Sequence, residues 1–363
     1  MTRARDFADL AGSADAGGIT GKNMFTNGAM QVNQRGSVNT SDGSSVYSLD
    51  RWVTFLRGGP AATLSQSTDV PTGQGFANSL KLDVTTADAL GTASDFCKVS
   101  QKMEGQNCQH LAKGTSNAKK VTLQFWVKST ITGTYIIELF DDDNTRQVSQ
   151  AYTISSSNTW EHKTLTFPAD TSGALADDNG NSFEVVWGLG MGSTYTSGTL
   201  NTSWASNTQA NRFVGQVNAL SSTSNEFYLT GCQLEIGEQA TPFEHEDIGT
   251  TLRKCQRYYF KFLEGNTKEI GVAWYFTASH SSFMLRYPTT MRATPTGIDS
   301  TGTGYYTIFR NGGSDAVNSI TFENGSTEQF SAFNNSEASG TAGQAGLIRS
   351  TDASAKVEFD AEL

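Results

Sequence analysis

The stretch from residue 225 to residue 259 constrains the fold most, because its apolar repeat changes there from a period of two to a period near 3.6. From Phe227 to Ile236 the side chains are apolar on both alternating faces over much of the run, which predicts a strand inside a sandwich. Gly237 ends this run, and Pro242 cannot donate to a strand ladder. A one-sided helical spacing follows in Ile248, Leu252, Cys255 and Tyr259.

Short strand-like runs separated by turn signals recur on both sides of this stretch. Those before the helix are MFT, AMQV, DRWVTFL, SLKLDV, KKVTLQFWVKS, TYIIELF, QAYTIS, WEHKTLTF and FEVVWGLGMG. Those after it are YYFKFL, IGVAWYFTAS, SFMLRYP, YYTIFRN, VNSITFE, QFSAFN, AGLIRS and AKVEFDAEL. Alternation in VTLQFWV places one face in a core and leaves Trp126 exposed or half covered on the other. Asn27-Gly28 is either a hairpin turn or a bulge within a strand, and the sequence leaves both open.

Length and composition favour two β-domains rather than one. The chain has 363 residues and 36 glycines, and 37% of its residues are apolar, which is enough for two sandwich-like cores. The sequence shows no repeat of fixed period. We therefore predict an all-β fold with an N-terminal extended arm and linker at 1–22, a jelly-roll β-sandwich at 23–246, a short linking helix at 247–259, and a second, smaller antiparallel β-domain at 260–363.

Four motifs in this chain resemble a module of bacteriophage tail-fibre and virion structural proteins. They are GKNMFTNGAMQVNQRG from Gly21, YSLDRW from Tyr47, the FWVK…TGTY stretch that ends at Tyr135, and TGCQLEIGEQATPFE…CQRYY up to Tyr259. The chain departs from the module's pattern at His245, where an Arg is usual, and at Thr250 and Thr251, where an acidic pair is usual. The third motif is also similar, more loosely, to jelly-roll carbohydrate-binding modules.

The resemblance implies a structural virion protein, a tail fibre or fibre-like appendage that presents β-domains for attachment to host-surface glycan. It also implies a homo-oligomer, a trimer, and attachment of the N-terminus to other virion proteins of the tail, neck or capsid. Arg3, Arg5, Phe7 and Leu10 are the expected anchor residues, with a frayed terminus as the alternative. A head, neck or collar fibre or decoration protein is a second interpretation, and a carbohydrate-active enzyme or its binding module is a third.

Charge and hydropathy exclude several partners. The formal net charge is −10 and the basic residues are scattered, which argues against nucleic acid. The sequence contains neither a signal-peptide core nor an apolar run long enough for membrane insertion, so we expect assembly in the bacterial cytoplasm and a final location in the virion. The four cysteines match no zinc spacing; buried thiols are expected, with a Cys97–Cys108 disulfide as the alternative.

The residues that could support catalysis form no recognisable set, so we expect no enzyme, no cofactor and no metal. The histidines His110, His162, His245 and His280 stand far apart, and the run Asp141-Asp142-Asp143-Asn144 is expected to be a solvated hairpin tip rather than a calcium loop. Glycan hydrolysis needs two paired carboxylates, but the sequence gives no reason to pair any of Glu104, Glu138, Glu161 and Glu184.

Aromatic side chains are dense after residue 257, and more of them occur than one core can hold. A ring that stays exposed can stack on the C–H face of a sugar. We expect the glycan or receptor surface at Trp274, Tyr275, Tyr305 and Tyr306, because adjacent aromatic residues in a strand point to opposite faces and one of each pair can face solvent. Domain or subunit contacts are the alternative role for these rings.

Overall fold

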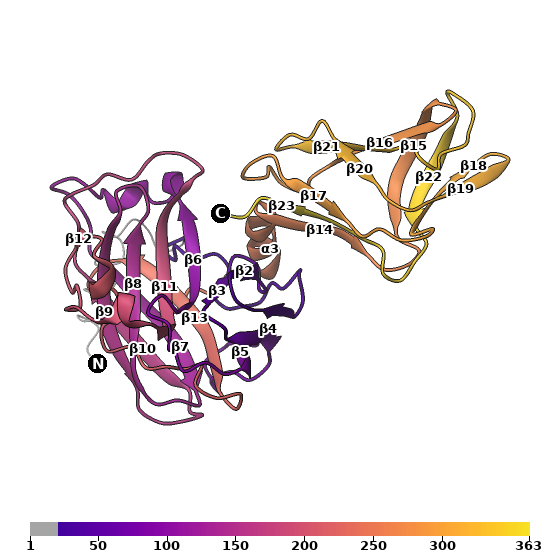
Figure 1. The fold of residues 1–363 in the computed structure, drawn as a ribbon. Coiled ribbons are helices and arrows are strands. Elements are labelled where there is room, and N and C mark those ends of the chain that lie inside the picture. Colours follow the sequence, from indigo (N-terminus) through magenta and orange to yellow (C-terminus); the bar gives the residue numbers. More distant parts are fainter. Residues whose placement is uncertain (1–20) are drawn as a thin grey trace. The chain divides into compact units, whose positions relative to one another are not determined.

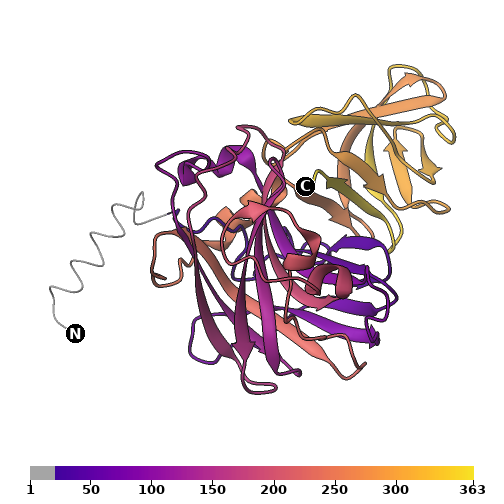
Figure 2. The ribbon, with the colours of Figure 1, turned by 60° about the vertical axis from the view of Figure 1, so that its left-hand side comes forward.

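The computed structural model describes residues 21–363, so the predicted anchor residues Arg3, Arg5, Phe7 and Leu10 lie outside the described part of the chain. The described chain is nearly all β, which confirms the predicted fold class. It divides into two compact units, one ending at Thr251 and also holding Leu363, and one spanning Leu252–Glu362 (Figures 1 and 2). The boundaries predicted for the four parts stay predictions.

The first unit is a sandwich of two antiparallel sheets. Sheet A has the order β1-β4-β5-β13-β7-β10. Its strands are β1 (Val38–Thr40), β4 (Ala61–Ser67), β5 (Ser79–Thr86), β13 (Glu226–Ile236), β7 (Val121–Ser129) and β10 (Glu161–Phe167). Neighbours such as β5 and β13 are far apart in sequence, so the sheet forms only when distant segments meet.

Sheet B has the order β12-β9-β8-β11-β6-β3-β2. Its strands are β12 (Ala205–Ser206), β9 (Arg146–Ile154), β8 (Gly133–Asp141), β11 (Asn181–Met191), β6 (Phe96–Glu104), β3 (Val53–Arg57) and β2 (Ser44–Tyr47). Short helices lie in the connections: η1 (Gly105–Asn107), η2 (Gln109–Leu111), α2 (Ser193–Thr196) and η3 (Gln209–Asn211). In the first unit, strands β1, β2, β4, β6 and β12 were not among the predicted strands.

Alternate residues of the two sheets meet to form one core, which explains the period of two in the sequence. At its centre the Trp187 ring lies 5.5 Å from the Trp52 ring and 5.6 Å from the Phe125 ring, measured between centroids. All three side chains are buried, and leucines of β5, β7 and β13 surround them. Burial of such large rings contributes the main driving force for this unit.

A β-bulge in β13 alters the alternation that the sequence suggested. Thr230 pairs with Trp126 and Gln233 with Gln124, so Gly231 and Cys232 together face the single residue Phe125. Gly231 takes the left-handed conformation with φ +62°, which glycine adopts easily. The bulge turns Cys232 and Leu234 into the core and Gln233 outward, so β13 is not apolar on both faces as its period-two pattern suggested.

The N-terminal motif residues hold a segment without strands against the sandwich. Asn27 accepts a hydrogen bond from Val32 N at 3.0 Å, and Trp52 Nε1 donates to Asn27 O at 3.0 Å. Asp50 accepts from the Gln34 backbone and side-chain amides at 2.7 and 2.6 Å. Asn27 lies in a turn with φ +60° outside any strand, so both predictions for Asn27-Gly28, and the strands MFT and AMQV, are wrong. Side-chain hydrogen bonds, together with two backbone bonds to β13 at 2.9 Å (Met24 N to Leu234 O and Cys232 N to Gly28 O), take the place of a regular strand ladder here.

The predicted linking helix is observed as α3 (Ile248–Gln256). Asp247 precedes it and accepts hydrogen bonds from the backbone N–H groups of Gly249 and Thr250, at 2.9 and 3.3 Å. Such a carboxylate satisfies amide groups that have no partner within the helix, which explains why the helix begins at this point.

The second unit contains two antiparallel sheets around its own core. Sheet C has the order β14-β23-β17 and sheet D the order β19-β18-β22-β15-β16-β21-β20. The strands of sheet C are β14 (Tyr259–Glu264), β23 (Lys356–Asp360) and β17 (Thr296–Asp299). Those of sheet D are β19 (Gly313–Val317), β18 (Tyr306–Arg310), β22 (Ala345–Ser350), β15 (Glu269–Thr277), β16 (His280–Arg286), β21 (Gln329–Asn334) and β20 (Thr321–Glu323). Phe359 of sheet C and Phe330 of sheet D are both buried, and their ring centroids are 4.2 Å apart.

Candidate functional site

The outer face of sheet A carries an unusual number of rings for a surface. We call it the aromatic face and define it by Phe76, Trp126, Trp160, His162, Tyr228 and Phe243. Trp126 and Tyr228 point to the outer side of the sheet because their strand neighbours Phe125 and Phe227 point into the core. Tyr228 is nonetheless buried, since Lys128 and Trp160 lie against its ring. Register then places Trp126 beside His162 on β10 and Tyr228 beside Lys128 on β7.

Trp126 and His162 form the open centre of the aromatic face. Their ring centroids are 5.1 Å apart, Trp126 is half-buried and His162 is exposed. The His162 ring lies 3.2 Å from Gln124 Oε1, measured from Nε2. Loss of hydration on the side of the ring that faces the protein, followed by the charge of Lys163, lowers the pKa of His162 and so favours the neutral ring. The two rings are tilted by 43° to each other and form an apolar surface, while the Gln124 amide beside them is buried and its Nε2 donates to Thr241 O.

A second ring pair lies at one end of the aromatic face. The Trp160 and Tyr228 rings are 6.1 Å apart, and the Lys128 ammonium lies 4.2 Å from the Tyr228 ring centroid. Trp160 Nε1 donates to Asp69 Oδ1 at 2.9 Å, and Lys128 also pairs with Asp69. Burial opposes the Asp69 charge, but the Lys128 and Trp160 hydrogen bonds hold its pKa below its usual value. This end therefore combines rings with charged hydrogen-bonding groups.

The other end is covered by the segment from 241 to 246, which belongs to the QLE…ATPFE motif. Glu235 accepts hydrogen bonds from the Thr241 backbone amide at 2.8 Å and from its hydroxyl at 2.6 Å. Gln233 Oε1 accepts from Glu244 N at 2.7 Å. The segment brings Phe243 to an edge contact with Phe76 at 5.0 Å between centroids. The polar residues of this motif are thus structural, because each holds the segment against β13.

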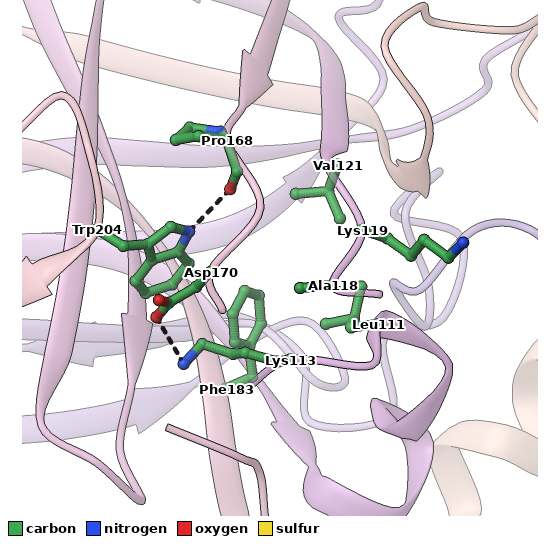
Figure 3. Close-up of a pocket in the computed structure, with 9 residues that line it drawn as sticks. All are labelled: Leu111, Lys113, Ala118, Lys119, Val121, Pro168, Asp170, Phe183 and Trp204. Atoms are coloured by element: carbon green, nitrogen blue, oxygen red, sulfur yellow. Dashed lines mark hydrogen bonds and ion pairs between the residues drawn. The ribbon is translucent and has the colours of Figure 1, made fainter. Parts of the chain in front are cut away.

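A small cavity lies at one edge of the first unit, lined by nine residues that Figure 3 labels. Trp204 Nε1 donates to Pro168 O at 2.9 Å, and the Lys113 ammonium lies 4.9 Å from the Trp204 ring centroid (Figure 3). The free volume is about 20 Å³, which suits one water molecule. This cavity is too small for a sugar ring.

Carboxylates on sheet B are neutralised by neighbouring cations. Glu138 is fully buried, and Arg212 donates to both of its oxygens at 2.8 and 2.6 Å. Burial raises the pKa of Glu138 despite this partner. Burial also opposes the charge of Glu184, but Lys98 at 2.5 Å and Ser100 at 2.6 Å hold its pKa below its usual value.

The two remaining carboxylate candidates are also engaged, Glu104 with Gln106 at 2.6 Å and Glu161 with Lys163 at 2.5 Å. Residues 21–363 contain no group of three or more His, Cys, Asp or Glu side chains that could hold a metal ion. Cys97, Cys108, Cys232 and Cys255 are all free and buried, so the alternative of a Cys97–Cys108 disulfide is not realised. Within the same described residues, no helix has the length and apolar character needed to span a membrane.

The predicted distal aromatic residues are divided by burial. Trp274 is exposed and Tyr305 is half-buried, whereas Tyr275 and Tyr306 belong to the core of the second unit. Tyr275 donates to Asp315, and Tyr306 donates to two backbone carbonyl oxygens at 3.0 Å. Tyr275 and Tyr306 therefore cannot form a receptor surface, because the strand alternation that exposes one residue of each pair buries the other.

The sequence pointed to Trp126 as an outward residue but not to the rings around it. Phe76 and Trp160 come from loops, and nothing in the local pattern indicates that they reach β7. The signal that could have found them is the glycine at 231: a Cβ built there would meet the Phe76 ring at 2.6 Å and Trp126 at 3.1 Å. A glycine within a strand often marks such a close approach.

No protein-family model matches this chain, and no curated protein matches it. Similar solved structures include the enzymatically active domain of tailspike protein 4 of bacteriophage CBA120, with 15% identity and a TM-score of 0.31, covering 59% of this chain. The match spans 21% of that tailspike chain.

Two carbohydrate-binding modules are also similar in structure. A family 11 module of a cellulosomal cellulase from Clostridium thermocellum has 12% identity and a TM-score of 0.27, covering 56% of this chain and 97% of that one. A xylan-binding domain from Paenibacillus barcinonensis has 10% identity and a TM-score of 0.28, covering 61% and 97%. These TM-scores are low, and the function proposed below is argued from the residues of this chain.

Proposed function

We propose that this chain is a non-catalytic structural protein of a bacteriophage particle, a tail fibre or fibre-like appendage, and that it binds saccharide through the aromatic face. The virion role is supported by the four sequence motifs. Saccharide binding is supported by one observation, the open Trp126–His162 ring pair on the aromatic face. A sugar offers an apolar C–H face to such rings and hydroxyl groups to polar side chains around them, such as the partly exposed Asp69 carboxylate.

The absence of catalysis is part of the proposal. A glycosidase needs one carboxyl group that reaches the leaving oxygen and a second that acts on the opposite side of the bond. Glu138 is fully buried behind Arg212, and Glu184 is paired with Lys98. Both carboxylates stabilise sheet B in this interpretation. Hydrolysis of any saccharide by the purified chain, lost on Glu138→Gln or Glu184→Gln, would show that the alternative enzymatic interpretation is correct.

The virion partners belong to the same proposal. Arg3, Arg5, Phe7 and Leu10 would contact another virion protein, and copies of the chain would assemble into a trimer, made in the host cytoplasm and carried on the particle. Electron microscopy of particles with the chain labelled tests this arrangement. Label at the tail supports a tail fibre, label at the head, neck or collar supports the second interpretation, and particles without label contradict both.

The binding experiment compares Trp126→Ala and His162→Ala with Trp274→Ala, each as the full chain on an array of bacterial surface saccharides. We expect the first two to weaken binding at least about tenfold and the third to leave it unchanged. Circular dichroism and thermal melting check that each variant is folded.

The pattern of loss decides between two surfaces. Loss confined to Trp274→Ala would place the binding surface on the second unit, as the sequence suggested. Binding that survives all three substitutions, or a wild-type chain that binds no saccharide on the array, would contradict the proposal.

A further inference from the structure

One face of the second unit is apolar and uncovered within that unit. Val272, Trp274 and Phe276 point outward from β15, and Met284 points outward from β16, which pairs with β15. Their exposed fractions are 67%, 42%, 72% and 52%. We call these four residues the sheet D patch. Strand β15 is the central strand of the seven in sheet D, so the patch lies in the middle of the sheet.

The opposite side of the same strand is already in a core. Ala273 and Tyr275 alternate with the patch residues and are buried. Strand β15 is therefore apolar on both faces, which is the pattern of a strand covered on both sides. Antiparallel sheets that face water on one side normally have polar residues there, whereas the centre of this face is apolar.

The outward positions that pair directly with Val272 and Trp274 hold uncharged side chains. Leu347 on β22 pairs with Val272, and Ser282 on β16 pairs with Trp274. Phe309 on β18 lies next to Leu347, and Arg349 sits over its ring at 4.2 Å from the centroid. Charged side chains lie around the patch: exposed Arg286 follows Met284 by two residues on β16, and Glu269 of β15 pairs with Arg349. A partner for this patch therefore needs an apolar centre with polar groups around it.

The apolar area of the patch is large enough to form part of a stable protein interface. A fully exposed ring or long apolar side chain presents about 150–250 Å², so the four residues together present on the order of 400 Å². A stable interface takes about 800 Å² from each partner, a little over half of it apolar. The patch thus supplies the apolar share that one side of such an interface requires.

We propose that the sheet D patch is the contact between copies of this chain, in a closed assembly where the same residues of each copy meet around a symmetry axis. Among the described residues six large apolar side chains are exposed, and four of them form this patch. The best apolar complement that the chain offers is therefore the same patch on another copy. The inference deepens the assembly part of the proposed function and does not depend on saccharide binding.

The composition of the patch also favours protein over saccharide. Val272 and Met284 lie beside the rings, and aliphatic side chains cannot form the flat stack that a sugar prefers. The outward positions next to Trp274 are Ser282 and Ala345, neither of which is a carboxylate or an amide. The aromatic face of the first unit has a partly exposed carboxylate, that of Asp69, so the two surfaces differ in chemistry.

The experiment measures the mass of the full-length chain by analytical ultracentrifugation over a range of concentrations. The double variant Val272→Thr/Phe276→Thr keeps strand-forming residues and removes most of the exposed apolar surface. Ile298→Thr is the matched control, because Ile298 is exposed at 44% but lies on β17 of sheet C. We expect a closed wild-type oligomer, an unchanged control, and a dissociation constant about a hundredfold higher for the double variant.

A cross-link provides a second measurement that does not weaken the interface. Ala345 is exposed on β22 and pairs with Trp274, whereas Ala353 is exposed in the turn before β23. The four native cysteines are buried, so a short bismaleimide should join copies of Ala345→Cys and not copies of Ala353→Cys.

The outcomes separate the surface from the assembly. A wild-type dimer that the double variant dissociates would support the patch and contradict the trimer. An oligomer that the double variant leaves intact, without an Ala345→Cys cross-link, would overturn the patch but keep the assembly. A monomeric wild-type chain would overturn both the contact at the patch and the assembly. If that monomer also lost saccharide binding in the variant Val272→Thr/Phe276→Thr, the patch would be a saccharide-binding surface instead.

Discussion

Lys113 shows how much a single buried charge depends on its surroundings. Its ammonium group pairs with Asp141 and lies 2.9 Å from Asp170 Oδ2. It also donates to the carbonyl oxygens of Ser172 and Gly173, at 3.1 and 2.9 Å. Lys113 thus occupies the centre of an oxygen cage, where it holds β8 to the segment after β10. The predicted solvated hairpin tip is correct for Asp142 and Asp143, but Asp141 is buried.

The substitution Lys113→Met should lower the free energy of unfolding by about 3–5 kcal/mol, because it leaves two buried carboxylates without this countercharge. Lys120→Met is the matched control. Lys120 pairs with Glu238 at 2.7 Å, but their side chains are 50% and 68% exposed, so its loss should cost below about 1 kcal/mol. Urea unfolding at neutral pH measures both. Equal losses for the two variants would mean that the oxygen cage does not stabilise the fold.

At the scale of elements, the bulge in β13 connects the fold with the aromatic face. Two residues of β13 oppose one of β7, which turns Gln233 outward to hold the 241–246 segment. The left-handed Gly231 also leaves the space that Phe76 and Trp126 fill. A single element therefore positions both the covered end and the open centre of the aromatic face.

The substitution Gly231→Ala should reduce stability by more than about 2 kcal/mol and weaken saccharide binding, since the added carbon meets the Phe76 ring and the backbone is strained. Gly43→Ala separates the two causes. Gly43 also has a left-handed φ, +73°, but a Cβ added to it would meet no atom within 4 Å, so only about 1 kcal/mol should be lost. Thermal melts and saccharide titration of both variants measure the losses in stability and in binding. Similar losses for the two variants would show that crowding of the Phe76 ring has no effect.

At the scale of the whole molecule, the residues from 21 onward form two main cores, and a smaller cluster that includes Phe96, Ile136 and Phe213 belongs to the first unit. One consists of residues of sheets A and B, and the other of residues of sheets C and D. Each unit falls within the size range in which single domains fold alone.

We therefore expect residues 21–246 and 247–363, a division that keeps α3 whole, each to give a folded β-protein when expressed separately. Circular dichroism and the dispersion of amide signals in NMR spectra measure this. The full chain is the control, and its spectrum should resemble the sum of the two pieces. A piece that is soluble but unfolded would show that its core needs the rest of the chain.

The sequence by itself determined the elements that depend on local pattern. The all-β class follows from runs of period two, and α3 follows from the change to a helical period after Pro242. It also showed that one residue of each aromatic pair at 274–275 and 305–306 could face solvent, and it placed Trp126 on an outer face. These features depend on spacing along the chain, which the sequence contains in full.

The tertiary structure decided which surfaces carry the rings. Phe76, Trp160 and His162 meet Trp126 and Tyr228 only because sheet A joins strands and loops that are far apart in sequence. After the bulge at Gly231, the residues of β13 that face the core are those that a strict period of two would place on the outer side. Likewise, the outward residues of β15 form a patch only beside those of β16 and β22. Long-range pairing fixes these neighbours, and the energy that selects the pairing comes from the packed core rather than from any local segment.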